Sequence, residues 1–349
     1  MKKKLSVLKY RGKKGNILRK KIKKKIGKKN KKIDKKKIYK TTIKTILVIL
    51  FLFIIFSIEI LYYNFQNNKD FIIDIRELKN RNNIIFKAKE DITLVSAYFN
   101  AKAKFTHMDY LNWINNFLKI NHSLIFFIDD SNYEEIISKR PTEYRKKTLW
   151  VKTNLTDFYS YKKYFREFDK TFEVDIEKNI HSVLLYLIWA EKINFLKIAT
   201  LKNYFHSKCF YWVDAGCFRD NSKIEKYINN WPSTEKCYED GRILINEIMQ
   251  HSQALKNELK IFNIEIYKNF QRFHNVDASI FGGEKKYILK FTDLYYNILN
   301  KFIKHGIFIG KDQNIFAYIA YFYPDIVKLV YSGYYFYFQE YLSKGYNKK

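Results

Sequence analysis

From residue 91 onward, short apolar runs rich in β-branched and aromatic residues alternate with longer segments of helical spacing. This alternation constrains the fold most, because strands that alternate with helices predict a mostly parallel sheet flanked by helices. Strands are expected at ITLVSAYF (92–99), SLIFFIDD (123–130), LWVKTNL (149–155), CFYWVDAG (209–216), and near 262–267, 276–281 and 307–310. Helices are expected over 111–117, 179–200, about 241–258, 284–304 and 313–322. The sequence therefore predicts one α/β domain over residues 91–349.

A long apolar segment, TILVILFLFIIFSIEILYY (45–63), precedes this domain, and its one charge is Glu59. Nineteen helical residues rise about 28 Å, close to the roughly 30 Å hydrocarbon core of a bilayer. We therefore expect a transmembrane signal-anchor helix at 45–63, in contact with a lipid bilayer, and a polar stem over 64–90. A cleaved signal peptide and a buried core helix are the less favoured alternatives.

The basic residues ahead of this segment predict its orientation. Residues 1–44 hold 22 Lys and Arg and a single acid, and so carry +21 of the net charge of +30. Lysine on the N-terminal side predicts a basic cytoplasmic tail, with the domain on the opposite side of the membrane. If the source is eukaryotic, that side is the ER or Golgi lumen. The tail has only two aromatic residues for base stacking, so no nucleic-acid partner is expected.

The cysteines exclude some classes of site. Cys209, Cys217 and Cys237 form no C-x-x-C pair, which argues against a zinc ribbon or a dithiol redox motif. One disulfide with a leftover thiol is compatible with an oxidising compartment. The sequence also lacks the P-loop, G-x-G-x-x-G, G-x-S-x-G and H-E-x-x-H motifs, which disfavours kinases, NTPases, dehydrogenases, serine hydrolases and metalloproteases.

A carboxylate directly follows the apolar strand in FYWVDAGCFRD (210–220). Ligands of doubly wound sheets bind beyond the carboxyl ends of the strands, which favours Asp214 as a functional residue. Ser96, Ala97 and Tyr98 end the first strand and are expected at the same edge. Gly216 would allow a sharp turn and a close approach of a ligand. The alternative is that Asp214 caps the turn that follows.

Lys192 lies in the middle of an apolar helical stripe formed by Leu185, Trp189, Leu196 and Ala199. Its amine could reach water along a packed stem, or it could be held against an anion.

Two further segments carry polar residues beside glycine. A Gly282-Gly283 turn is expected before a helix. Asp312 follows Lys311 at the start of the last helix, where it could be an ordinary N-cap beside an anion-binding helix terminus.

Taken together, ITLVSAYF, LIWAEKINFL, YWVDAGCFR, FGG and FIGKDQ resemble, in this order, the HtrL/YibB family with its WlaTC-type members. The resemblance covers residues 92 to about 330. That family is regarded as glycosyltransferases of surface-polysaccharide or glycan assembly. The resemblance implies a GT-A-like fold, a nucleotide-sugar donor and a glycan acceptor.

The resemblance also implies roles for the residues singled out above. Asp214 would bind Mn²⁺ or Mg²⁺ and take part in catalysis, although Gly216 replaces the second acid of a D-x-D motif. Asp312 would act as the base or orient the acceptor. The donor would be bound by Ser96, Ala97, Tyr98, Lys192, Gly216 and Arg219, and the acceptor by Gly282, Gly283 and Gln313.

The function predicted from the sequence is that of a membrane-anchored glycosyltransferase. The alternative is a membrane-anchored glycan- or nucleotide-binding protein without catalysis.

Overall fold

The computed structural model describes residues 90–145, 147–229, 231–250, 276–333 and 335–343, together with seven single residues between 43 and 55. The predicted tail, most of the predicted anchor and stem, and the strand expected near 262–267 lie outside the described residues. The chain divides into two compact units, Met1–Asp70 and Phe71–Lys349. Within the described residues, no helix has the length and apolar character needed to cross a bilayer.

The second unit contains a sheet of seven strands in the order β3-β2-β1-β4-β6-β5-β7. These strands are β1 (Ile92–Tyr98), β2 (Ser123–Ile128), β3 (Thr148–Lys152), β4 (Cys209–Val213), β5 (Ile243–Glu247), β6 (Val276–Glu284) and β7 (Val327–Tyr331). Every pairing is parallel except those of β6, which runs antiparallel to both β4 and β5. The predicted mixed α/β fold with a mostly parallel sheet is confirmed.

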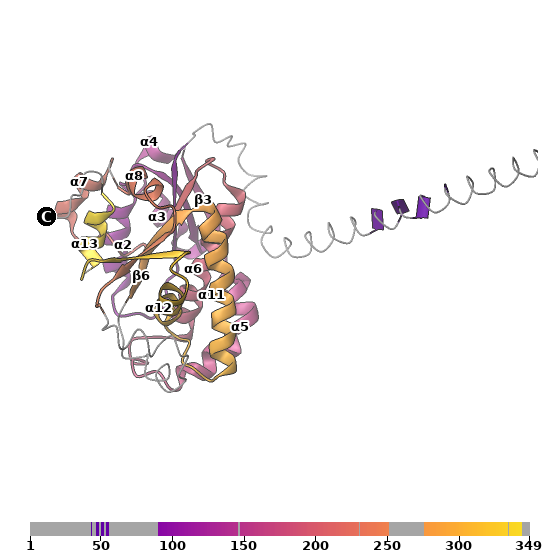
Figure 1. The fold of residues 1–349 in the computed structure, drawn as a ribbon. Coiled ribbons are helices and arrows are strands. Elements are labelled where there is room, and N and C mark those ends of the chain that lie inside the picture. Colours follow the sequence, from indigo (N-terminus) through magenta and orange to yellow (C-terminus); the bar gives the residue numbers. More distant parts are fainter. Residues whose placement is uncertain are drawn as a thin grey trace, which may run out of the picture. The chain divides into compact units, whose positions relative to one another are not determined.

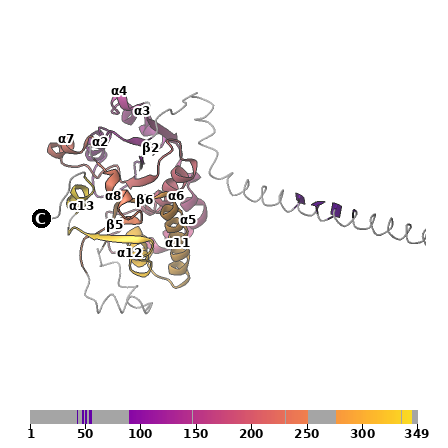
Figure 2. The same cartoon turned by 45° about the horizontal axis from the view of Figure 1, so that its top comes forward.

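Helices cover both faces of the sheet (Figure 1, Figure 2). The longer ones are α2 (His107–Phe117), α5 (Tyr159–Phe172), α6 (Val183–Lys202), α11 (Lys285–Lys304) and α12 (Asp312–Phe322). The short ones are α3 (Asp130–Ile137), α4 (Thr142–Arg145), α7 (Ile224–Tyr227), α8 (Thr234–Tyr238) and α13 (Tyr335–Tyr341), with single 3-10 turns at Leu155–Asp157 and Asn221–Lys223. One face packs against α5, α6, α11 and α12, and the other against α2, α3, α7, α8 and α13.

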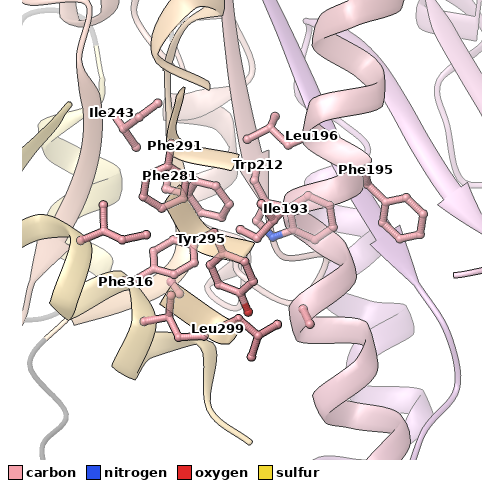
Figure 3. Close-up of a cluster of buried hydrophobic side chains, with 14 of the residues drawn as sticks. Ile193, Phe195, Leu196, Trp212, Ile243, Phe281, Phe291, Tyr295, Leu299 and Phe316 are labelled. Carbon is pink, nitrogen blue, oxygen red and sulfur yellow. The ribbon is translucent and has the colours of Figure 1, made fainter. Parts of the chain in front are cut away.

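Strand β4 is apolar along its whole length because it is covered on both sides. Phe210 and Trp212 belong to the core on the α6 side, whereas Cys209, Tyr211 and Val213 belong to the core on the α2 side. Because both faces of this strand are covered, both sets of alternate residues are apolar or aromatic. Figure 3 shows Trp212, Phe281 and Phe316 within the α6-side core, where the ring centroids of Phe281 and Phe316 lie 4.7 Å apart.

Three expected elements differ in the structure. Residues 243–247, predicted to be helical, form β5, because pairing with β6 and β7 buries all five of them. Residues 307–310 are buried but do not form the expected strand. The expected Gly-Gly turn is wrong, because Gly282 and Gly283 lie inside β6 opposite Tyr211 and Phe210. A Cβ on Gly282 would stand 2.2 Å from the carbonyl oxygen of Phe210, so close strand packing explains the glycine.

Candidate functional site

A cavity of about 210 Å³ lies at the edge of the sheet where β1 and β4 end and β6 begins. Its walls come from the end of β1 and the segment that follows to Phe105, from α2 and α6, and from the residues after β4. Asp277 and Ser279 of β6 complete the lining. The cavity therefore occupies the position that the strand-end rule predicts for a ligand.

Six of the predicted site residues line this cavity: Ala97, Tyr98, Lys192, Asp214, Gly216 and Arg219. The remaining five lie outside its lining: Ser96, Gly282, Gly283, Asp312 and Gln313. Ser96 is fully buried in β1. Gly282 and Gly283 stand at the opposite end of β6 from Asp277, so an acceptor in the cavity would not reach them.

The amine of Lys192 is the electrostatic centre of the site. Its Nζ lies 2.5 Å from Asp312 Oδ2 and 3.7 Å from Asp214 Oδ1, and it donates to the carbonyl of Ala278 at 2.8 Å. The residue is only 2% exposed, so the alternative in which its amine reaches water is wrong. The amine is held against anions, and those anions are carboxylates of the protein itself.

These carboxylates keep Lys192 charged. Burial acts to lower the pKa of Lys192, but Asp214 and Asp312 outweigh that effect, and the pKa lies above its ordinary value. The protonated form of Lys192 is therefore favoured, and it places a positive charge in the cavity wall.

Asp214 is held by one hydrogen bond and one ion pair and remains accessible. The indole Nε1 of Trp212 donates to Asp214 Oδ1 at 2.6 Å, and the side chain of Asp214 is 36% exposed. Burial raises the pKa of Asp214 to about 6, against the opposing effect of Lys192, and Asp312 and Asp277 add to the rise. Among the described residues, its carboxylate is held by an indole and an ammonium, which does not support the alternative of a turn cap.

Asp277 is the functional candidate that the sequence analysis missed. It is 8% exposed and lines the cavity from the start of β6. Its two carboxylate oxygens accept from the backbone N–H of Ser279 at 2.9 Å and from the Ser279 hydroxyl at 2.7 Å. The cavity lies at the carboxyl ends of β1 and β4, and a residue at the amino end of a strand lies there only if that strand is antiparallel to them. The sequence pattern around Asp277 does not reveal that β6 is antiparallel to β4.

Three carboxylates, those of Asp214, Asp277 and Asp312, influence the charge of Lys192. One ammonium cannot neutralise three acids, and two of them, Asp214 and Asp277, face the cavity. Carboxylate oxygens are the ligands that Mg²⁺ and Mn²⁺ prefer. Both residues offer carboxylate oxygens at the cavity, and Asp277 is a second acid that Gly216 cannot provide.

Arg219 forms another part of the cavity wall. Its guanidinium centre lies 4.4 Å from the ring centroid of Trp113 and 4.6 Å from that of Phe105, and its Nε donates to Gly216 O at 3.1 Å. Gly216 permits this arrangement, because a Cβ there would approach the Tyr110 ring to 3.0 Å. The stacked guanidinium is a fixed cation on the cavity surface.

Asp312 lies behind Lys192 rather than in the cavity. Its side chain is 6% exposed, and it is the first residue of α12, whose N-cap is Lys311. Lys311 in turn is paired with Glu177, so the predicted anion-binding spot is occupied by a side chain of the protein. Asp312 is not among the residues that line the cavity, and it contacts the cavity through Lys192. Its role as base or acceptor-orienting group stays a prediction.

A second polar cluster contains Asp175, Glu177 and His181, whose ligand atoms lie within 4.8 Å of one another and could hold a metal ion. His181 Nδ1 lies 2.7 Å from Asp175 Oδ2, which also accepts from the hydroxyl of Tyr186. With Glu177 paired to Lys311, the cluster is already satisfied by hydrogen bonds and an ion pair. It therefore needs no metal to be stable.

No family model and no curated protein matches the sequence. Among solved structures, core-mannan synthase A (CmsA/Ktr4) from Aspergillus fumigatus, in its Mn/GDP form, is 14% identical with a TM-score of 0.42, over 69% of this chain and 73% of that chain. The 4-diphosphocytidyl-2C-methyl-D-erythritol synthase from Anaerococcus prevotii is 13% identical with a TM-score of 0.30. That alignment covers 73% of this chain and 91% of the synthase chain. Neither similarity is close enough to assign an activity, which must be argued from the cavity.

Proposed function

We propose that this protein is a glycosyltransferase with a GT-A-like domain, which moves a sugar from a nucleotide-diphosphate donor to a hydroxyl group of a glycan. The observation that carries the proposal is the cavity at the ends of β1 and β4, which Asp214, Asp277 and Arg219 all line. The sequence resemblance to the HtrL/YibB family agrees with this assignment.

The charges of the cavity suit a diphosphate bound together with a divalent cation. Asp214 and Asp277 would hold Mn²⁺ or Mg²⁺, which would neutralise the charge that develops on the departing diphosphate. Arg219 offers a fixed guanidinium, whose planar N–H groups match phosphate oxygens. Lys192 would keep Asp214 ionised and oriented instead of contacting the phosphate, because its amine already faces Asp312, Asp214 and the Ala278 carbonyl.

The end of β1 would receive the nucleoside. Ala97 and Tyr98 line the cavity, and the Tyr98 hydroxyl is hydrogen-bonded to His107 Nδ1 at 2.6 Å. Backbone groups beyond a strand end are the usual partners of a nucleotide in such sheets.

The cellular setting belongs to the same proposal. The predicted anchor at 45–63 and the basic tail favour a single-pass protein with its domain on the non-cytoplasmic side. A disulfide between Cys209 and Cys237 agrees with an oxidising compartment, where such bonds persist.

The first test is a screen of nucleotide sugars against the purified full-length protein, with and without Mn²⁺. Donor hydrolysis or transfer supports an enzyme. Donor binding without turnover would favour the non-catalytic binding protein instead.

The decisive variant is Asp214→Asn. Asparagine can still accept from the Trp212 indole, so the melting temperature should be unchanged or slightly higher, because a partly buried charge has been removed. Transfer should fall by more than tenfold, because the cation or diphosphate loses a charged partner. Asp293→Asn is the matched control, since Asp293 lies on α11 with its side chain 69% exposed. Retention of more than a tenth of the activity, a barrier change below about 1.4 kcal/mol, would remove Asp214 from the active site.

A further inference from the structure

Helix α6 presents an apolar wall to the cavity. Leu185, Ile188 and Trp189 line it, followed by Lys192. Positions spaced by three and four residues lie on one face of a helix, so this wall runs directly into the charged end of the site. A ligand that bridges both regions needs a charged group beside an apolar ring face.

Trp189 is held in place from behind. The His181 ring meets the Trp189 ring edge-on, with centroids 5.2 Å apart and planes at 83°. Tyr186 packs on the same indole at 6.1 Å. The indole is therefore packed on its inner side and faces the cavity with the remainder of its surface.

His181 is itself immobilised by the buried acid Asp175. The Nδ1–Oδ2 distance is 2.7 Å, and the same carboxylate accepts from the Tyr186 hydroxyl, while its other oxygen accepts from the Glu177 N–H at 2.9 Å. His181 is 8% exposed and Asp175 is 4% exposed. The hydrogen-bonded pair of His181 and Asp175 therefore supports Trp189 from behind, an arrangement typical of a preorganised binding surface.

We propose that Trp189 is the surface on which the pyranose ring of a bound sugar stacks, and that Asp175 and His181 position its indole. This inference rests on the proposed function and names the part of the site that recognises the sugar. The C–H face of a pyranose is apolar and flat enough to pack on an indole, while its hydroxyl groups remain available to polar partners.

The position of the wall favours a sugar over a nucleobase. Trp189 lies one helical turn from Lys192, which holds Asp214, so a ring on Trp189 lies next to the site proposed for the diphosphate. A base also needs polar partners along its edge, and Leu185 and Ile188 provide none. The ring that stacks here belongs either to the donor or to the acceptor, and the experiment separates the two.

The test uses purified full-length protein carrying Trp189→Leu or Trp189→Phe. Leu201→Ala is the control on the same helix, because Leu201 is 49% exposed and does not line the cavity. The probes are UDP, GDP, UDP-glucose, UDP-galactose and GDP-mannose, with para-nitrophenyl pyranosides as acceptors. Trp189→Leu should raise the KM for the acceptor, or for the sugar nucleotide, at least tenfold, and Trp189→Phe by no more than about threefold. The Kd for free UDP or GDP should change less than twofold. The substrate whose KM increases is the one that carries the stacked sugar ring.

The positioning role of His181 is tested by a double-mutant cycle. His181→Ala should raise the same KM in the wild-type background with kcat nearly unchanged, but should have no further effect in Trp189→Leu, because it acts through the indole. An equal effect in both backgrounds would overturn that role.

Two results would overturn the stacking role itself. One is a weaker affinity of Trp189→Leu for free UDP or GDP, which would assign the indole to the base. The other is an unchanged affinity for every sugar probe in a variant that unfolds like the wild type. If the wild-type protein bound no nucleotide sugar, the proposed function would fail, but calorimetric titration of the para-nitrophenyl pyranosides into wild type and Trp189→Leu would still decide the stacking.

Discussion

At the scale of the residue, the sequence around Lys192 gives no indication of the ion pair that its side chain forms. An apolar stripe around a lysine suggests that methionine would be tolerated at that position. In the folded protein, however, the ammonium is the partner of Asp312, which is only 5% exposed. Removal of one member of a buried ion pair leaves an uncompensated charge, which costs far more than the net value of the pair.

We therefore expect Lys192→Met to lower the free energy of unfolding by about 3–5 kcal/mol. Adding Asp312→Asn should restore much of that loss, because the orphaned charge is removed. Urea unfolding of the two single variants and of the double variant measures the coupling. A Lys192→Met protein as stable as the wild type would show that solvent or a local rearrangement compensates Asp312.

At the scale of the element, Glu191 of α6 joins two helices. Its carboxylate accepts from the backbone N–H groups of Tyr159 at 3.2 Å and Ser160 at 2.8 Å, which are the first residues of α5, and from the Asn194 amide at 2.6 Å. The start of a helix has unpaired N–H groups, so α6 supplies the cap that α5 lacks in its own N-cap residue, Phe158. Despite these donors, burial raises the pKa of Glu191 to about 7.

This raised pKa predicts a pH dependence of stability. The folded protein binds the proton of Glu191 more tightly than the unfolded chain does, so its contribution is greatest below about pH 4.5 and is lost as the pH rises through about 7. The loss amounts to at most about 3 kcal/mol. Glu191→Gln, which cannot ionise, should flatten this part of the profile between pH 5 and 8.

Urea unfolding across that pH range, compared with the exposed-site control Glu173→Gln, isolates the effect from other titrating groups such as Asp214. Parallel profiles for wild type and Glu191→Gln would mean that Glu191 does not titrate in this window.

For the domain as a whole, the disulfide between Cys209 and Cys237 joins the first residue of the central strand β4 to α8. Both cysteines are buried, and the third, Cys217, is a buried free thiol. The sequence left the pairing open, because three cysteines allow three pairings. The fold selects one of them by placing α8 against the α2-side face of the sheet.

The bond closes a loop between residues 28 apart in sequence, and cross-linking a loop of that length restricts the unfolded chain. The expected stabilisation is about 3–4 kcal/mol. Urea unfolding in the presence of a phosphine reductant should therefore show a lower midpoint, and Cys209→Ala/Cys237→Ala should match it without reductant. Cys217→Ala should respond to reductant as the wild type does. A midpoint that reductant leaves unchanged in the wild type would show that the cross-link contributes little.

The sequence by itself determined the elements whose local pattern is strong. The prediction of β1, β2 and β4 followed from their high content of β-branched, aromatic and other apolar residues, and Asp214, Gly216 and Arg219 followed from the end of β4. The sequence missed β5 and β7, because short segments such as ILINE become strands only through their pairing partners.

Only the tertiary structure decided which charges meet. Antiparallel pairing places Val213 opposite Ile280, and this register brings Asp277 to the same cavity as Asp214 across 62 intervening residues. Likewise, the packing of α6 and α12 gives Lys192 the partner Asp312, and the α5–α6 connection places His181 behind Trp189. Periodicity and burial are local properties that a sequence encodes in its spacing. The partner of a buried charge depends on strand order and helix packing, which arise only when distant segments are folded together.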